Sequence, residues 1–101
     1  MPSYKISINQ NALADIEEIS EWYNGQKENL GIAFKKQLIS QIDELIHFPK
    51  SASIRYKNVR CLVIKKFPFM VHYTVNDTSK LVEVYAVLHT SRNPTTWKNI
   101  K

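Results

Sequence analysis

The feature that most constrains the fold is an apolar stripe over residues 30–45. Its members recur at steps of four, four, four and three residues: Leu30, Phe34, Leu38, Ile42 and Leu45. This spacing places them on one side of an α-helix. Phe48-Pro49 ends the helix, because the residue before a proline is pushed out of the helical region. A helix with one apolar side needs an apolar surface to cover, so the rest of the chain must supply that surface.

The residues before this stripe predict a short strand and another helix. Residues 4–8 alternate between apolar and polar side chains, as in a strand. Apolar side chains then recur at helical spacing, and Asn9 and Asn11 can cap a helix N-terminus. We therefore expect a first helix from about residue 11 to residue 28. The link to the next helix is short, so the two helices form a hairpin.

The downstream residues predict a sheet for this hairpin to cover. Three segments are rich in β-branched and aromatic residues: 59–66, 69–75 and 81–89. Short turns join them, so neighbouring strands are antiparallel. In the last strand, alternation places one set of side chains on the face that packs on the helices: Val82, Val84, Ala86 and Leu88. The same alternation places His89 on the other, open face.

These elements predict a single α+β domain over residues 1–101. An N-terminal strand and a helical hairpin pack on one face of a three- to four-stranded antiparallel sheet.

Charge is divided unequally along the chain. Residues 1–48 hold four basic and seven acidic side chains, a balance of −3, whereas residues 49–101 hold ten basic and two acidic ones, a balance of +8. Such polarity favours a polyanionic partner such as nucleic acid, although a small soluble protein can also simply be basic. We expect the open face of the sheet to form the basic surface.

Several classes of protein do not fit the sequence. The single cysteine, Cys61, excludes an internal disulfide framework and a cysteine-based metal cluster. The three histidines show no metal-binding spacing, and there is no phosphate-binding glycine motif. No segment resembles a signal peptide or a membrane helix. We therefore expect a cytoplasmic protein that needs no metal or other cofactor and does not bind a membrane.

The basic half also carries side chains suited to RNA cleavage. Arginine and lysine can stabilise phosphate charge, histidine and tyrosine can transfer protons, and aromatic rings can stack on bases. The candidates are Lys57, Arg60, Lys66, Tyr73, His89, Arg92 and Trp97. Each also has an ordinary structural interpretation. His89 can be merely exposed, the Arg60 stem can cover apolar surface, and Tyr73 can belong to the core.

An ordered set of short motifs resembles the RelE/ParE superfamily of type II toxin–antitoxin toxins, also called plasmid-stabilisation proteins. The matching segments are residues 12–16, Trp22-Tyr23, 30–34, Phe48-Pro49, 58–60, 67–73 and 87–94. The resemblance implies a helical hairpin against a sheet. It also implies a growth-arresting toxin that a cognate antitoxin protein holds inactive. RelE-like members cut messenger RNA on the ribosome without a metal, whereas ParE-like members inhibit DNA gyrase and are not known nucleases.

The resemblance also suggests site residues. Arg60 and Arg92 fall where RelE-like toxins place arginines of the active surface, and with His89 they are the predicted catalytic residues. Lys57, Lys66, Tyr73 and Trp97 are the predicted substrate-binding residues. Trp97 stands where RelE-like enzymes have a catalytic tyrosine, and their lysine pair has only rough counterparts in Lys50 and Lys57. Ribosome-dependent mRNA cleavage is one hypothesis, and non-enzymatic inhibition of gyrase is the alternative.

Overall fold

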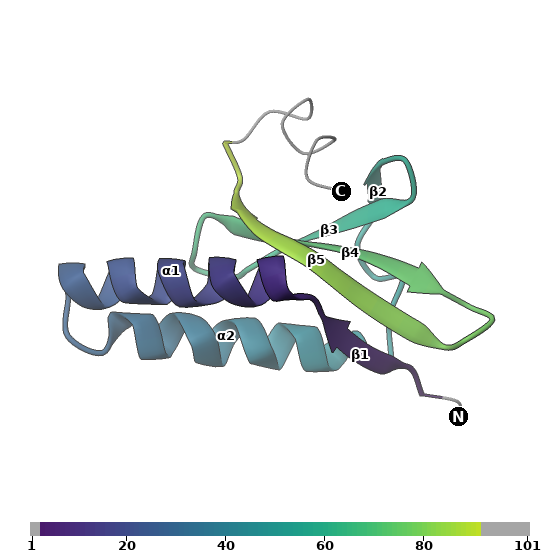
Figure 1. The fold of residues 1–101 in the computed structure, drawn as a ribbon, viewed down its shortest axis with the longest axis horizontal. Coiled ribbons are helices and arrows are strands. Elements are labelled where there is room, and N and C mark those ends of the chain that lie inside the picture. Colours follow the sequence, from purple (N-terminus) through teal and green to yellow (C-terminus); the bar gives the residue numbers. More distant parts are fainter. Residues whose placement is uncertain (1–2, 92–101) are drawn as a thin grey trace.

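A helical hairpin and a five-stranded sheet make up the fold in a computed structural model, which describes residues 3–91 (Figure 1). The elements follow in the order β1 (Lys5–Ile8), α1 (Gln10–Gln26), α2 (Leu30–Glu44), β2 (Ile54–Tyr56), β3 (Val59–Val63), β4 (Phe69–Asn76) and β5 (Leu81–His89). The α+β fold class is therefore confirmed. The second helix ends at Glu44 rather than at Phe48, and hydrogen-bonded turns carry the chain from there to Phe48.

Side-chain caps and one glycine set the geometry of the hairpin. The Asn9 side chain accepts a hydrogen bond from the Ala12 N–H at 2.9 Å, so Asn9 is the cap of α1. At the other end of α1, Asn24 Oδ1 accepts a hydrogen bond from the Gly31 N–H at 2.7 Å. A Cβ atom at position 31 would lie 2.1 Å from the Ser20 carbonyl oxygen. Only glycine therefore lets the two helices approach this closely.

The sheet differs from the predicted one in strand number and direction. Its order is β1-β5-β4-β3-β2, with β1 parallel to β5 and the other neighbours antiparallel. The sheet is therefore mixed and has five strands, not three or four antiparallel ones. The parallel pair arises because α1 and α2 lie between β1 and the remaining strands in sequence, so β1 can join the far edge through a long crossover.

A β-bulge in β5 changes which side chains face the helices. His72 pairs with Ala86, whereas Tyr73 pairs with Val84, which leaves Tyr85 as the extra residue. Val82 and Val84 pack in the helix-side core as predicted, but after the bulge Val87 takes that role. The prediction that Ala86 and Leu88 share this face was wrong, because both belong to a cluster with β2 and β3 residues on the other face.

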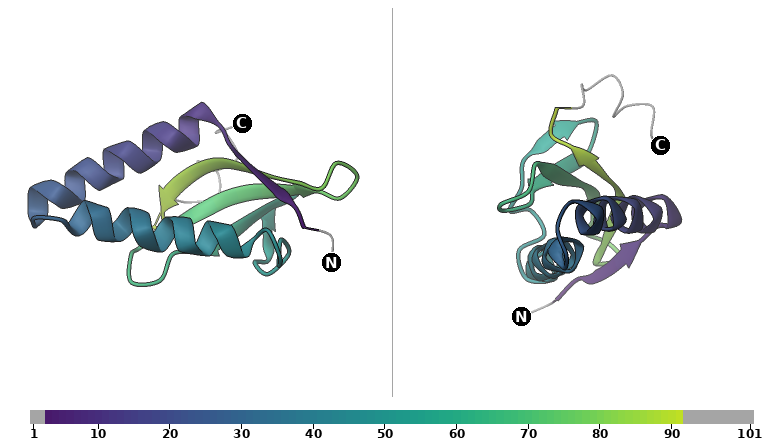
Figure 2. Two further views of the ribbon diagram at one scale, coloured as in Figure 1. Left: turned by 90° about the horizontal axis from the view of Figure 1, so that it is seen from below. Right: turned by 90° about the vertical axis from the view of Figure 1, so that its left-hand side faces the viewer.

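Buried side chains form two clusters, one on each face of the sheet. Figure 2 shows the helical hairpin along one side of the sheet, where Phe34, Leu38 and Leu45 meet β4 and β5. We call these contacts the helix-side cluster. The other cluster, which we call the second-face cluster, contains Tyr56, Val59, Cys61, Met70, Ala86 and Leu88. The expectation that the open sheet face is a basic surface was therefore wrong, because buried and mainly apolar side chains occupy it.

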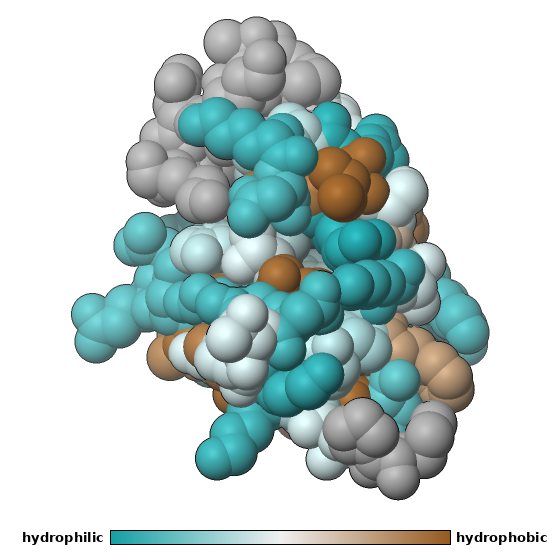
Figure 3. Space-filling model, turned by 90° about the vertical axis from the view of Figure 1, so that its right-hand side faces the viewer, coloured by the Kyte–Doolittle hydropathy of each residue, from teal (hydrophilic) through white to brown (hydrophobic). Residues whose placement is uncertain are grey.

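The end of the molecule at the β4–β5 turn is polar, and mainly hydrophilic side chains cover it (Figure 3). There the Asp77 carboxylate accepts hydrogen bonds at 2.8 Å from both Lys50 Nζ and the Tyr4 hydroxyl. These bonds, with that from Lys50 the stronger influence, lower the pKa of Asp77. The cluster ties the N-terminal residues and the loop after α2 to the tip of the sheet.

Candidate functional site

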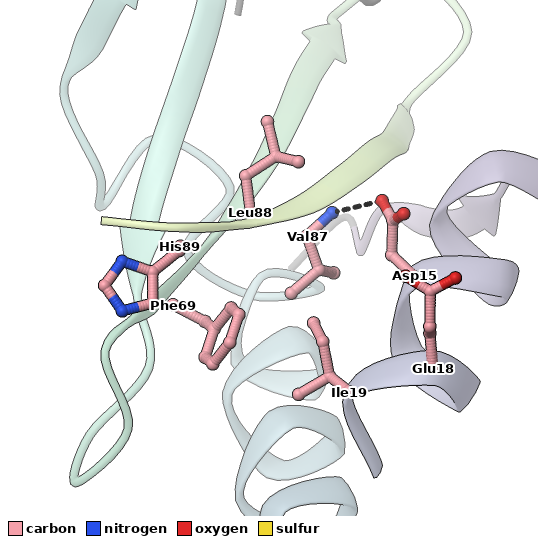
Figure 4. Close-up of a pocket in the computed structure, with 7 residues that line it drawn as sticks. All are labelled: Asp15, Glu18, Ile19, Phe69, Val87, Leu88 and His89. Carbon is pink, nitrogen blue, oxygen red and sulfur yellow. Dashed lines mark hydrogen bonds between the residues drawn. The ribbon is translucent and has the colours of Figure 1, made fainter. Parts of the chain in front are cut away.

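A groove lies at the opposite end of the sheet, between α1 and the end of β5 (Figure 4). Residues from three elements line it: Asp15, Glu18, Ile19, Phe69, Val87, Leu88 and His89. Two adjoining hollows extend it along α1 to Trp22, Tyr23 and Pro68. We call the whole depression the α1–β5 groove.

The groove exists because β1 is shorter than β5. The β1 pairing ends where Ile8 meets Val84, so within residues 3–91 no strand lies beside the following part of the β5 edge. There Asp15 Oδ2 accepts the Val87 backbone N–H at 3.0 Å. A helix side chain thus takes the place of a neighbouring strand, and it holds the end of β5 against α1 (Figure 4).

His89 is one predicted site residue that lies in this groove. Its ring packs edge-on against Phe69, with centroids 5.2 Å apart, and it is exposed. The Ser91 N–H donates to Nδ1 at 3.0 Å, so the neutral ring carries its proton on Nε2. His89 therefore lies on the helix side of the sheet and not on the open face, because the bulge reverses the alternation.

Lys66 lies at the same end of the sheet as His89. It is exposed, with φ at 75°, in the turn between β3 and β4. The next residues of that turn touch the end of β5, since the Thr90 N–H donates to the Pro68 carbonyl at 2.9 Å. An exposed lysine and an exposed histidine thus share this end of the molecule.

Arg60 and Tyr73 lie elsewhere and make structural contacts. They are cross-strand partners on the helix side of the sheet. Arg60 Nη1 donates to the Ala52 carbonyl at 2.7 Å, and the Tyr73 hydroxyl donates to the Pro49 carbonyl at 2.8 Å. Tyr73 is completely buried, which leaves its hydroxyl no surface for a substrate contact. Both side chains hold the loop after α2 against the sheet.

The remaining predicted residues are Lys57, Arg92 and Trp97. Lys57 is exposed in the β2–β3 turn, with φ at 47°, at the other end of β3 from Lys66. Arg92 and Trp97 lie outside the described residues. Of the predicted site residues that the structure describes, only His89 and Lys66 lie together at the same end of the sheet. Sequence reasoning missed Asp15, Glu18 and Trp22, although their spacing of three and four residues places them along one side of α1.

A second group with unusual chemistry lies within the second-face cluster. His72 is completely buried, with its Nδ1 3.1 Å from the Tyr56 hydroxyl and 3.5 Å from Cys61 Sγ. Burial, and to a lesser degree the Arg55 charge, lowers the pKa of His72 to about 4. Burial also raises the pKa of Cys61 to about 11 and, with a smaller effect from Cys61, the pKa of Tyr56 to about 12. All three groups are therefore neutral near pH 7, as a structural cluster requires.

Two further findings concern the described part of the chain only. Residues 3–91 contain no group of three or more His, Cys, Asp or Glu side chains that could hold a metal ion. Within the same range, neither helix is both long and apolar enough to span a membrane.

Comparison with known proteins identifies the family. A family profile described as the ParE toxin of the type II toxin–antitoxin system parDE matches residues 6–94. The chain belongs to the ParE toxin family. The resemblance to the RelE/ParE superfamily is thereby confirmed, and the chain is a toxin of the type II toxin–antitoxin class. A comparison with curated protein sequences found no match.

Solved toxin structures share the fold of this ParE-family chain. A chromosomal ParDE system from P. aeruginosa matches with a TM-score of 0.74 and 17% identity, covering 85% of this chain and 95% of that one. The E. coli RelBE toxin–antitoxin complex matches with a TM-score of 0.68 and 18% identity, covering 88% and 99%. The archaeal RelE–RelB complex from Pyrococcus horikoshii gives a TM-score of 0.59 and 12% identity, covering 92% and 100%. At these identities the similarity establishes the fold alone.

Proposed function

We propose that this toxin arrests growth by binding DNA gyrase as a protein inhibitor. The match of a ParE profile over residues 6–94 carries the proposal. The position of Arg60 also supports it, since its guanidinium bonds main-chain carbonyls rather than facing a substrate. In this proposal the toxin acts by occupying a surface of gyrase and transfers no protons.

A supercoiling assay tests the proposal directly. Purified toxin is added to gyrase, relaxed plasmid and ATP, and we expect loss of supercoiling as toxin approaches the gyrase concentration. Leu38→Asp provides the control, because it places a charge at a completely buried position and should unfold the toxin. Normal supercoiling at saturating folded toxin would rule out gyrase as the target.

We also propose that the chain is held inactive by a cognate antitoxin. Support comes from the similar structures, of which the E. coli RelBE and P. horikoshii RelE–RelB structures are described as complexes. Co-expression with the product of the adjacent gene should relieve growth arrest, and the two proteins should elute together in size-exclusion chromatography. Growth arrest that persists, with separate elution, would contradict this partner.

Ribosome-dependent mRNA cleavage is the second candidate function. The observation that favours it is the exposed His89 ring, with a donor at Nε2, at the same end of the sheet as Lys66. This function predicts new mRNA 5′ ends within codons after induction. It also predicts that His89→Asn abolishes those ends, because asparagine can accept the Ser91 hydrogen bond but cannot transfer a proton.

A matched variant makes this result specific. His47 is also exposed but lies beyond the end of α2, so His47→Asn should leave any cleavage unchanged. Intact transcripts in arrested cells would exclude the nuclease and leave gyrase inhibition as the proposal.

A further inference from the structure

The outer part of the α1–β5 groove is a hollow with aromatic walls. Trp22, Tyr23, Pro68, Phe69 and His89 line this hollow, whose volume is about 440 Å³. The Trp22 and Tyr23 rings meet at 71°, with centroids 5.1 Å apart. The Phe69 and His89 rings meet at 78°, and Tyr23 also contacts Phe69, with centroids 6.1 Å apart. Trp22 is 59% exposed, so its ring is accessible to a partner at the mouth of this hollow.

Carboxylates border the same groove. Glu18 lies one helical turn before Trp22 and lines the adjoining hollow together with Ile19 and Phe69. Asp15 lies one turn earlier and lines the inner part of the groove with His89, where it also accepts the Val87 N–H (Figure 4). The three hollows share Phe69, so aromatic faces and acidic side chains run along one continuous surface.

This combination selects for a cation. The face of an aromatic ring attracts an ammonium or guanidinium group, and a nearby carboxylate adds an ion pair. The same groups repel phosphates and carboxylates, so this surface does not suit the polyanion that the overall charge suggests. A hollow of this volume is larger than one cationic side chain and can also take an apolar neighbour from the same segment.

We propose that the aromatic hollow binds an arginine or lysine side chain presented by an extended protein segment with apolar residues beside it. Trp22 and Phe69 contact the flat face of the cation, and Glu18 pairs with its charge. Apolar neighbours of the cation cover Ile19 and the Phe69 ring. The proposal does not depend on gyrase inhibition, but it conflicts with mRNA cleavage at His89, which lines the same groove.

Titration of the full chain with short peptides tests the proposal. The probe is the blocked tripeptide Leu-Arg-Leu, and its matched control replaces arginine with citrulline, which has the same shape but no charge. Binding is followed by the NMR signal of the Trp22 indole N–H, which Trp22→Phe identifies. We expect a millimolar dissociation constant for the arginine peptide and about tenfold weaker binding of the citrulline peptide. Added salt should weaken binding of the arginine peptide only.

Variants on α1 locate the interaction. Glu18→Gln should weaken binding of the arginine peptide several-fold and leave binding of the citrulline peptide unchanged. Glu21→Gln is the matched control, because Glu21 is also exposed on α1 but does not line the groove, and it should have no effect. Equal binding of the two peptides, tighter binding of Leu-Glu-Leu, or no shift of the Trp22 signal would each overturn the proposal.

Discussion

Both faces of the sheet carry buried side chains, but the two clusters are built from different chemistry. On the helix side, Phe34 packs between the rings of Tyr23, Phe67 and Phe69, with centroids 5.3 to 5.8 Å apart. On the second face, the completely buried His72 contacts a phenol and a thiol. The helix side therefore depends on apolar area and ring packing, whereas the second face also depends on the protonation state of one imidazole.

Burial alone therefore does not determine how the stability of each face depends on pH. The free energy from apolar contacts changes little with pH. A buried neutral histidine is different, because the folded protein becomes less stable once the pH is low enough for the unfolded chain to bind a proton at that residue. The same strands, β3 and β4, contribute to both faces, because their side chains alternate between them.

Phe34→Ala should have the largest effect on stability. Phe34 is completely buried, and its loss removes the centre of the ring cluster, so we expect the free energy of unfolding to fall by about 3–5 kcal/mol. Urea unfolding measures this, and the loss should be the same at neutral and mildly acidic pH. Phe34→Leu is the control, at roughly 1 kcal/mol. A loss for Phe34→Ala no larger than that of the control would show that the helix side is not the main core.

Lowering the pH should destabilise the second face. The pKa of His72 is about 4 in the folded chain against an ordinary 6.5, so between these values the unfolded state binds the proton and the folded state does not. Stability contributed by neutral His72 is therefore present above pH 6.5 and is lost as pH falls toward 4. The full effect is of order 3 kcal/mol.

His72→Gln separates this effect from the titration of carboxylates. Glutamine can bond the Tyr56 hydroxyl but does not titrate, so the variant should have a flatter stability profile over this pH window than the parent. Urea midpoints measured across the window give the comparison. Parallel profiles for the two proteins would show that His72 does not control the acid response.

Arg60→Ala should have an intermediate effect, although Arg60 is only partly buried. Its guanidinium donates to the Ala52 and Lys50 carbonyls, and loss of bonds from a charged donor costs about 2 kcal/mol. Thermal unfolding measures the loss. If Arg60→Ala instead abolishes toxicity with unchanged stability, then Arg60 belongs to the active surface after all.

Much of the fold could be predicted because it follows from local patterns. The α2 stripe, the Asn9 cap and the turns of the last three strands depend on residues close in sequence. The exact strand pairing could not be predicted, because the single extra residue Tyr85 reverses the faces of everything after it. That reversal moves His89 from the expected open face to the α1–β5 groove. The bonds of Arg60 to the loop after α2 depend on a distant contact that no local pattern encodes.

Two tyrosine variants should have the smallest effects and compare the faces most directly. Tyr73→Phe removes a hydroxyl that donates to the Pro49 carbonyl on the helix side, and Tyr56→Phe removes one that bonds His72 on the second face. Each should lower the free energy of unfolding by about 1 kcal/mol.

Only the loss in Tyr56→Phe should depend on pH. A hydroxyl that donates to the neutral imidazole adds to the lowering of the His72 pKa by burial, so the stability of Tyr56→Phe should change slightly less steeply with pH than that of the parent. Tyr73→Phe should run parallel to the parent, and a pH-dependent loss there would mean that the two faces are coupled.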